Sequence, residues 1–387
     1  VPGSLDDGQS GEGFPIEVFN VLGAGDGFFS GLIKGWMEDA DWPTALKYAN
    51  ACGAFAVSRH GCTPAYPSLA EMKFFLDRGI TRRDLRNDPE LEQVHWSTNR
   101  HTRTDGDWST MRVFAFDHRA QLEEMHGYTP EKGAAFKKLC LEAALAVKGD
   151  SAGYGILCDN RIGRSALHRA TGTGLWIGRP AEWPGSRPVT LEPELGSDCG
   201  ALREWARENV VKVLCFCHPD DDPATRETQE ATVRRLFEAS RRNNLEFLLE
   251  IIPSKVGPSD DDTTAKLISQ FYAAGIYPDW WKLEPLASDA AWTRAVAAIE
   301  AHDRHTRGIV VLGLDAPEAD LARSFETAAR HPLVKGFAVG RTIFGDTARA
   351  WFRDEIDDAQ AVAQMTEFFE RYDREKYGSD GAPLHDH

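Results

Sequence analysis

Four charged side chains lie in short apolar runs of the chain, where an isolated charge is costly. Lys282 lies in "DWWKLEP", Lys212 in "VVKVLCFC" and Glu250 in "EFLLEII", and Asp117 ends "MRVFAFD". Lysine is almost never fully buried without a partner, so these lysines call for a chemical explanation. A desolvated amine beside a second cation stays partly neutral near pH 7, and a neutral amine can attack a ketone to form a Schiff base.

The protonated imine is an electron sink, so these four residues could together cleave a carbon–carbon bond. Lys282 would carry the imine, and Lys212 would supply the neighbouring positive charge. Glu250 could move protons while the carbinolamine forms, and Asp117 could take the hydroxyl proton released at cleavage. Each of them alone could instead be an ion-pair partner, but four on four runs favour a site.

Eight short apolar runs must position these side chains, and most are separated by a segment with helical periodicity. They span residues 111–117, 154–159, 174–179, 210–217, 246–252, 279–285, 308–314 and 336–341. Buried strands alternating with helices indicate a parallel sheet covered on both faces. Eight such units in about 270 residues predict a (β/α)₈ TIM barrel, whose active site lies at the C-terminal ends of the strands. An open doubly wound sheet is the alternative.

A second motif, "NVLGAGDGFFSG", lies near the start of the chain. Gly23, Ala24 and Gly25 have little or no side chain, so their backbone N–H groups could approach an anion at the start of a helix. Asp26 follows in the first helical turn, where it could take a proton from a hydroxyl nucleophile. A glycine-rich turn of this kind is also typical of purely structural loops.

Length and composition bound the domain organisation and the kind of partner. The 387 residues predict an α/β piece over residues 1–80, a polar linker over 81–109 and the barrel over 110–387. A net charge of -16 argues against a nucleic-acid partner, and no apolar run is long enough for a membrane span. Seven cysteines without a CxxC pair, and no export segment, predict reduced thiols in a cytoplasmic protein. The first residue, Val1, suggests a fragment or a processed chain.

The glycine-rich string resembles the second signature of the ribokinase-like (PfkB) sugar kinases, and "YANACGAFAVSRHGCTPAYPS" resembles the segment that follows it there. The resemblance implies that the Gly23–Gly25 backbone stabilises charge on a transferred phosphoryl group and that Asp26 activates the sugar hydroxyl. It places Asn50 near the nucleotide, with ATP and Mg²⁺ as cofactors of a full-length kinase. Because only residues 1 to about 78 share it, we expect no sugar phosphorylation by this chain alone.

The later runs resemble the class I tagatose-bisphosphate aldolase group over most of residues 110–375. The segments that carry the resemblance are "FAFDHR", "VVKVLCFCHPDD", "FLLEII", "WWKLEP" and "GFAVGR". It implies that Lys282 forms the Schiff base with the help of Glu250, without a cofactor, and that Arg341 and Gly340 hold a phosphate. That family has a serine at the strand-seven phosphate site, whereas Gly313 here offers only a backbone N–H.

A kinase segment followed by such a barrel resembles the two-domain proteins of inositol catabolism. In those proteins a 5-dehydro-2-deoxygluconokinase is fused to a 5-dehydro-2-deoxyphosphogluconate aldolase-like domain. The resemblance implies cleavage of 5-dehydro-2-deoxy-D-gluconate 6-phosphate to dihydroxyacetone phosphate and malonate semialdehyde. The far carboxylate of this acid needs cations, and arginine pairs well with carboxylates. The loop candidates are Arg119, Arg161, Arg164 and Arg179.

Three other interpretations remain open. A metal-dependent aldolase could use His118 and His218 with "HPDDD", although two histidines without a close third ligand are a weak metal site, and we expect no metal. The barrel could be non-catalytic and stabilise or regulate the kinase, or it could cleave tagatose or fructose bisphosphates. The incomplete kinase part should expose apolar surface, which predicts poor solubility or association into a homo-oligomer.

Overall fold

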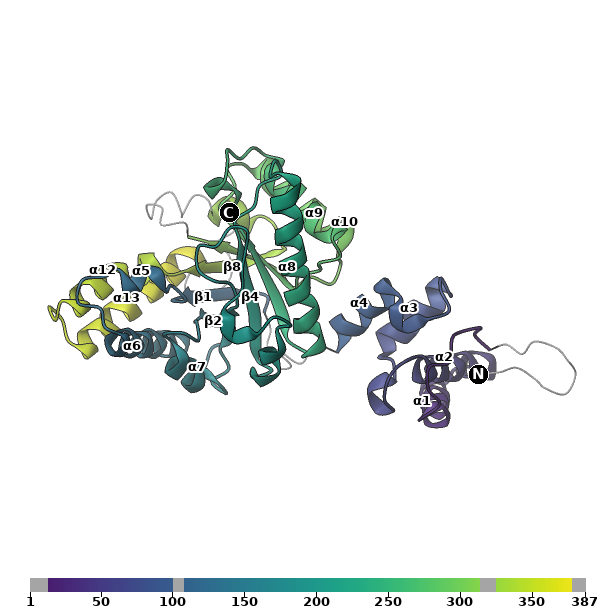
Figure 1. The fold of residues 1–387 in the computed structure, drawn as a ribbon. Coiled ribbons are helices and arrows are strands. Elements are labelled where there is room, and N and C mark those ends of the chain that lie inside the picture. The colour runs from purple at the N-terminus through teal and green to yellow at the C-terminus, as the bar shows by residue number, and fades with distance from the viewer. Residues whose placement is uncertain (1–12, 100–107, 314–324, 378–387) are drawn as a thin grey trace, which may run out of the picture. The chain divides into compact units, whose positions relative to one another are not determined.

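The computed structural model describes residues 13–99, 108–313 and 325–377, and the chain divides into two compact units, Val1–Arg100 and His101–His387. We call these unit 1 and unit 2 (Figure 1). The described part of unit 1 consists of α1 (Ala24–Met37), α2 (Trp42–Ser58), the 3₁₀ helix η1 (Thr63–Ala65), α3 (Leu69–Arg78), the 3₁₀ helix η2 (Leu85–Asn87) and α4 (Pro89–Thr98).

Small residues allow α1 and α2 to pack closely against each other. A Cβ on Gly35 would lie 2.6 Å from the Cα of Ala45, so only glycine fits at this crossing. The helix α2 begins at a capped turn, because the Asp41 carboxylate accepts a hydrogen bond from the N–H of Thr44 at 2.9 Å. The turn before α1 is thereby attached to a well-packed helix pair.

The polar stretch 81–109 is not a linker throughout, because η2 and α4 lie within it. The carboxylate of Asp88, which is 1% exposed, accepts hydrogen bonds from the backbone N–H groups of Glu90 and Leu91 and so caps α4. Leu85 and Leu91 are buried in the apolar core of unit 1. The linker prediction is wrong for these helices, since a few apolar residues and a buried cap were enough to fold a segment that is polar on average.

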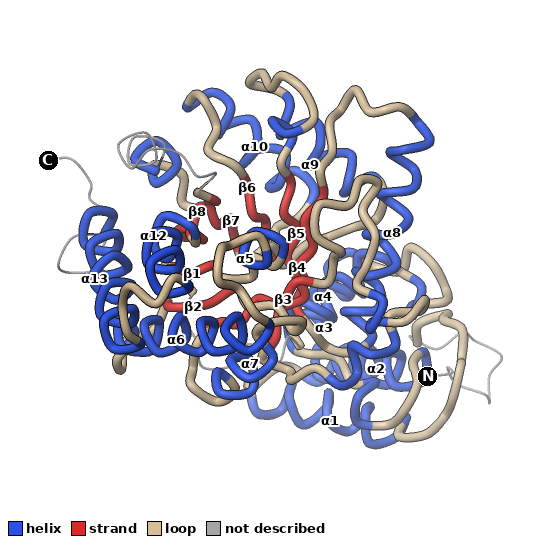
Figure 2. Tube along the Cα trace, turned by 60° about the vertical axis from the view of Figure 1, so that its left-hand side comes forward, coloured by secondary structure: helices blue, strands red, loops and turns tan. Residues whose placement is uncertain are grey.

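Unit 2 is a closed barrel of eight parallel strands in the order β1 to β8, as predicted. The strands are β1 (Met111–Ala115), β2 (Tyr154–Leu157), β3 (Trp176–Pro180), β4 (Asn209–Cys215), β5 (Glu246–Ile251), β6 (Trp280–Leu283), β7 (Gly308–Leu312) and β8 (Val334–Val339). Figure 2 shows the strands in red inside a ring of helices in blue. The predicted (β/α)₈ architecture is confirmed.

Helices follow most of the strands. The described helices of unit 2 are α5 (Ala120–Glu123), α6 (Pro130–Lys148), α7 (Arg164–Ala170), α8 (Pro223–Arg242), α9 (Thr263–Ala273), α10 (Asp289–His302), α12 (Arg341–Phe352) and α13 (Asp358–Tyr377). Between β3 and β4 the chain forms only two 3₁₀ helices, η3 (Pro193–Leu195) and η4 (Gly200–Glu204), and a further 3₁₀ helix, η5 (Pro253–Lys255), follows β5. None of the described helices combines the length and the hydropathy needed to cross a bilayer.

Alternation along the strands separates an inner from an outer set of side chains. The inner cluster consists of Met111, Val113, Ala115, Leu157, Trp176, Val210, Leu248, Trp280, Val310 and Ala338. The rings of Trp176 and Trp280 meet edge to face with centroids 5.9 Å apart, so the barrel interior is filled below its C-terminal end. The next inner positions after Val210, Leu248 and Trp280 are Lys212, Glu250 and Lys282. These three side chains therefore point into the barrel and not toward the helices.

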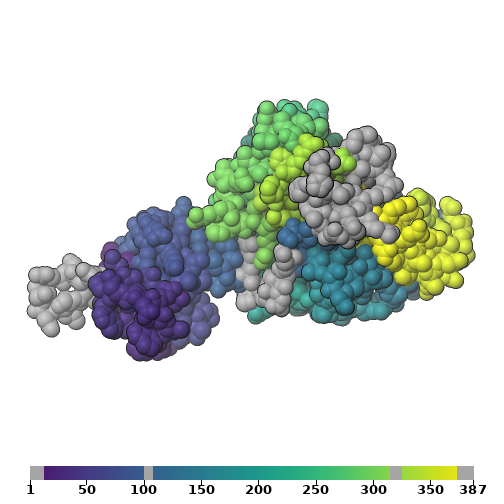
Figure 3. Space-filling model, turned by 180° about the vertical axis from the view of Figure 1, so that it is seen from behind, coloured from purple at the N-terminus to yellow at the C-terminus, as the bar shows by residue number. Residues whose placement is uncertain are grey.

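Unit 1, which begins at the purple end of the colour scale in Figure 3, exposes large apolar side chains on α1 and α2. The exposed large apolar residues of the described chain are, apart from Trp183, all in unit 1: Val18, Phe19, Val21, Leu22, Phe29, Ile33, Trp36, Met37, Trp42, Leu46 and Leu69. Four of them, from Phe29 to Met37, share one side of α1 by their helical spacing. The exposed surface expected of the kinase part is therefore present.

We predict that this face causes self-association. The double substitution Trp36→Lys and Met37→Lys should lower the concentration-dependent rise in sedimentation coefficient, because two large apolar side chains leave the face and two charges enter it. Lys73→Ala, on the exposed side of α3, is the control and should behave as the parent chain. A double variant that associates as strongly as the parent would rule this surface out.

Candidate active site

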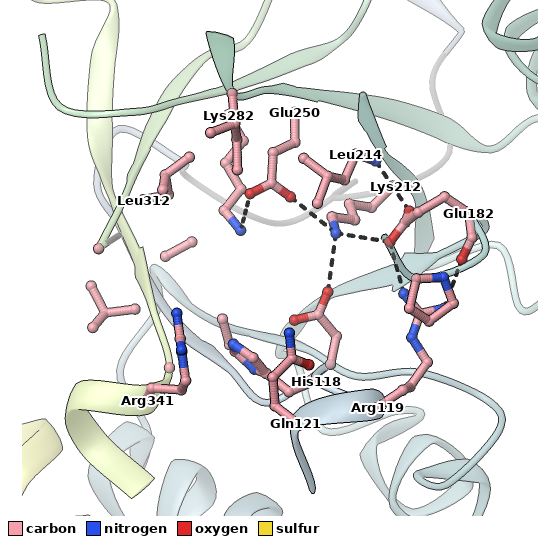
Figure 4. A pocket seen from close by; sticks show the side chains of 18 of the residues that line it. His118, Arg119, Gln121, Glu182, Lys212, Leu214, Glu250, Lys282, Leu312 and Arg341 are labelled. Carbon is pink, nitrogen blue, oxygen red and sulfur yellow. Dashed lines mark hydrogen bonds and ion pairs between the residues drawn. The ribbon is translucent and has the colours of Figure 1, made fainter. Parts of the chain in front are cut away.

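A cavity of about 360 Å³ opens at the C-terminal ends of the strands. Its wall includes Asp117 after β1, Lys212 on β4, Glu250 on β5 and Lys282 on β6. All four are buried, with exposed fractions of 9% or less. The structure thus brings together the four residues that the apolar runs had singled out (Figure 4).

Lys282 and Glu250 form the central pair. They are direct partners in the register between β5 and β6, and their side chains point to the same inner face. The Nζ of Lys282 lies 2.9 Å from Oε1 of Glu250. A buried amine in contact with a carboxylate has a proton acceptor at hand, which is what nucleophilic attack by an amine requires.

Lys212 lies at the centre of three carboxylates. Its Nζ is 3.0 Å from Oε2 of Glu250, 3.2 Å from Oδ2 of Asp117 and 3.2 Å from Oε1 of Glu182. Burial alone would lower the pKa of Lys212, but the three negative charges outweigh it and raise the pKa above its ordinary value. Lys212 is therefore a firmly charged ammonium group.

The same charges act on the carboxylates. Burial opposes ionisation of Asp117, but the positive charges of Lys212 and then Lys282 hold its pKa well below the usual range. The pKa of Glu250 is lowered by the same two lysines against the effect of burial. Both groups are thus ionised at neutral pH.

Glu250 lies between the two lysines and forms an ion pair with both. The positive charge of Lys212 is therefore close to Lys282, as predicted from the sequence, but it is compensated locally by carboxylates. Glu250 is placed to exchange a proton with Lys282.

Glu182 is a site residue that the sequence reasoning missed. It follows β3 by two positions, is 2% exposed, and accepts a hydrogen bond from the Leu214 N–H at 3.1 Å in addition to binding Lys212. Its Oε1 also accepts a hydrogen bond from Arg119 Nη2 at 2.8 Å. Its place just beyond the third apolar run was the available signal, because barrel sites are built from such positions.

The predicted arginines for a substrate carboxylate do not assemble as expected. Arg119 lines the cavity, but its guanidinium is bound to Glu182 and also to Glu192 at 2.8 Å. The other three, Arg161, Arg164 and Arg179, are not part of the cavity wall.

Local contacts explain the position of two of these arginines. Arg161 pairs with Glu123 at 2.8 Å on the surface. Arg179 points outward from β3 and lies 3.8 Å above the ring of Trp205, where burial lowers its pKa to about 10. Arg161 and Arg179 thus contact neighbouring residues and do not reach the cavity wall.

The ends of β7 and β8 carry the residues predicted to hold a phosphate. Gly313 follows β7, Gly340 and Arg341 follow β8, and all three line the same cavity. Gly340 precedes α12, and a Cβ there would overlap the carbonyl oxygen of Ala115, so glycine is required. An arginine at the first position of a twelve-residue helix, next to a glycine, is well suited to bind a phosphate. Figure 4 shows Arg341 and Lys282 reaching the same opening from different strands.

The glycine-rich motif of unit 1 also lies at a helix start. Gly23 has φ 77° and precedes α1, which begins at Ala24, and Asp26 is in the first turn. A Cβ on Gly25 would meet no atom within 4 Å, so the space above this turn is open. Asn50 lies on α2. The Ala24 N–H donates to the carbonyl oxygen of Val21 at 3.3 Å, and anion binding by this turn stays a prediction.

The two histidines considered as metal ligands lie in different surroundings. His118 lines the cavity, whereas Nε2 of His218 lies 3.0 Å from the carbonyl oxygen of Pro258. Within residues 13–99, 108–313 and 325–377, no group of three or more His, Cys, Asp or Glu side chains is arranged to hold a metal ion. The described side chains thus offer no ready metal-ligand set.

Comparison with known proteins connects unit 1 to sugar kinases. Residues 7–69 match the pfkB family of carbohydrate kinases. An ATP-dependent ribose-1-phosphate kinase of Halopiger xanaduensis is 41% identical over 66 residues, which are 17% of this chain and 22% of that kinase. A 5-dehydro-2-deoxygluconokinase of Geobacillus kaustophilus is 35% identical over 65 residues, 17% of this chain and 19% of the kinase. The chain thus spans about a fifth of the length of these curated relatives.

Unit 2 has a different set of relatives. A fructose-bisphosphate aldolase from Plasmodium falciparum, solved with TRAP and a small-molecule inhibitor, superposes with a TM-score of 0.51 over 69% of this chain and 90% of that chain. The sequence identity is 12%, so this likeness shows the fold alone. Residues 71–374 match the family described as "Uncharacterized protein conserved in bacteria (DUF2090)". Because this match covers most of its length, the chain belongs to the DUF2090 family.

Proposed function

We propose that the barrel is a class I aldolase that cleaves a phosphorylated keto substrate through a Schiff base on Lys282. The observation that carries the proposal is the buried contact of 2.9 Å between Lys282 Nζ and Glu250 Oε1 at the catalytic end of a TIM barrel. Ionised Asp117 and an anion-binding turn at Arg341 in the same cavity support it.

Formation of the imine uses the central pair. Glu250 takes a proton from the Lys282 ammonium group, and the neutral amine attacks the ketone carbon of the substrate. A proton then moves from nitrogen to oxygen in the carbinolamine, and protonated Glu250 returns its proton as the hydroxyl leaves as water. The product is an iminium ion, in which a C=N bond replaces the C=O bond.

Cleavage uses Asp117 as the base. It takes the proton of the hydroxyl on the second carbon from the imine carbon, a new C=O bond forms, and the electrons of the broken C–C bond move to the iminium as an enamine. The aldehyde leaves first. The enamine carbon then takes up a proton, and water hydrolyses the imine to release the ketone fragment and the Lys282 amine. Lys212 acts as a positioning residue, since it keeps both carboxylates ionised and in place.

The substrate we propose is 5-dehydro-2-deoxy-D-gluconate 6-phosphate, in a pathway of inositol catabolism. An imine at C5 activates the C3–C4 bond, which yields dihydroxyacetone phosphate and malonate semialdehyde. The similarity of the chain to 5-dehydro-2-deoxygluconokinases supports this choice, because such a kinase makes a phosphorylated keto acid. We assign unit 1 to the part of a sugar kinase that holds the transferred phosphoryl group, with Asp26 as base and ATP and Mg²⁺ bound by the complete kinase.

Borohydride trapping tests the proposed reaction. Incubating the chain with dihydroxyacetone phosphate and borohydride should reduce the iminium to a stable secondary amine, which mass spectrometry of peptides should locate on Lys282. Lys282→Met should give no adduct and should lower cleavage of the keto acid phosphate by at least about a thousandfold.

Lys138→Met on α6, outside the cavity wall, is the matched control and should keep both properties. Unchanged cleavage by Lys282→Met would show that the lysine is structural. Loss of cleavage with a chelator, together with no adduct, would favour a metal-dependent reaction instead.

The partly buried His118 of the cavity is expected to make stability depend on pH. Burial lowers the pKa of His118 to about 4, so it is neutral at pH 7. The unfolded chain, in which histidine titrates near its ordinary value of about 6.5, binds more protons between these two values, and the free energy of unfolding therefore falls as pH drops. His118→Gln should make the loss of stability between pH 7 and pH 4.5 smaller by about 2 kcal/mol.

Urea unfolding followed by tryptophan fluorescence measures this difference. Exposed His126→Gln is the control and should leave the pH dependence as in the parent chain. Identical pH profiles for His118→Gln and the parent would mean that His118 is protonated in the folded barrel as readily as in the unfolded chain.

A further inference from the structure

Most cations of the cavity wall are already bound to protein carboxylates. Lys282, Lys212 and Arg119 each contact at least one buried glutamate. These groups can organise the reaction, but their charge is balanced within the protein. They are poorly placed to neutralise a further negative charge at the other end of a substrate.

Lys255 differs from these cations. It lines the same cavity from the end of η5, just after β5, and its side chain is exposed. In the described part of the chain no carboxylate lies within ion-pair distance of its Nζ. The nearby Glu284 is buried, and its two oxygens accept hydrogen bonds from Ser254. Burial raises the pKa of Glu284, and the charge of Lys255 lowers it to a smaller extent.

The turn that carries Lys255 is firmly held. The N–H of Ser254 donates to Oε1 of Glu284 at 3.2 Å, and the Ser254 hydroxyl donates to the other oxygen of the same buried carboxyl group. On the other side of the turn, His218 Nε2 lies 3.0 Å from the carbonyl oxygen of Pro258. Lys255 therefore reaches the cavity from a fixed backbone, which reduces the ordering cost of binding a ligand.

The barrel order places Lys255 and Arg341 far apart around the opening. Lys255 follows β5 and Arg341 follows β8, and in the closed ring β6 and β7 lie between them on the shorter side. Lys282 is on β6, within this arc. A substrate with its keto group at Lys282 and its phosphate at Arg341 can thus extend its other end toward Lys255.

The wall near Lys255 favours a single negative charge. The cavity residues at the ends of β4 and β5 include the apolar side chains of Leu214, Phe216 and Ile252. One ammonium group in such surroundings can balance a carboxylate, whereas a phosphate dianion would keep an uncompensated charge beside apolar groups.

We propose that Lys255 binds the carboxylate at the end of the substrate opposite the phosphate and so selects phosphorylated keto acids over sugar bisphosphates. This inference rests on the proposed aldolase function and adds to it the residue that determines substrate class. It assigns to a lysine on the β5 turn the role first predicted for loop arginines, of which only Arg119 lines the cavity.

Three variants test the proposal. Lys255→Met should raise KM for 5-dehydro-2-deoxy-D-gluconate 6-phosphate about tenfold with little change in kcat, because an interaction present in both ground and transition state is lost. Lys255→Arg should restore most of the affinity. Exposed Lys266→Met on α9, outside the cavity wall, is the matched control and should leave KM unchanged.

Dihydroxyacetone phosphate separates failure of this inference from failure of the proposed function. Dihydroxyacetone phosphate lacks the carboxylate-bearing end of the keto acid, so its borohydride adduct should form equally in the parent chain and in Lys255→Met. No adduct in the parent would overturn the aldolase function itself. Equal adducts with an unchanged KM for the keto acid in Lys255→Met would overturn the role of Lys255. A larger loss for fructose 1,6-bisphosphate than for the keto acid would overturn the carboxylate assignment.

Discussion

The ion-pair network around Lys212 is the constraint on which the catalytic end of the barrel depends. Removing a lysine and three carboxylates from water is costly, and the cost is offset only when every charge meets its partners in good geometry. Asp117, Glu182 and Glu250 come from three different strands or their ends and converge on one Nζ. The network therefore fixes these strand ends relative to one another, and it fixes the acceptor that lies beside Lys282.

The barrel and the Lys282–Glu250 pair could be predicted because short stretches of the sequence are enough to indicate them. A buried parallel strand appears as an apolar run, and a charge inside such a run stands out, as with Lys282 in "DWWKLEP". Glu182 could not be found in this way, because it lies in irregular chain beyond β3. The role of Arg119 depended on Glu182 and Glu192, partners more than sixty residues away in sequence. Helix α4 was missed because a buried cap, and not composition, stabilises it.

Different observations support the fold and the proposed reaction. The likeness to fructose-bisphosphate aldolase concerns the architecture, and TIM barrels host many unrelated reactions. The proposed chemistry follows from the side chains of one cavity, where a lysine, its proton acceptor and a second base occupy adjacent positions. Unit 1 has a glycine-rich turn at the start of α1, so the chain contains two elements for which we predict binding of phosphorylated compounds.

The tryptophan-filled interior below the cavity has a consequence for turnover. Since Trp176 and Trp280 fill the barrel interior beneath it, the cavity is closed at its lower end. In the proposed reaction, both fragments of a cleaved substrate would therefore leave through the C-terminal end of the barrel. The free aldehyde would leave before the fragment that is still attached to Lys282.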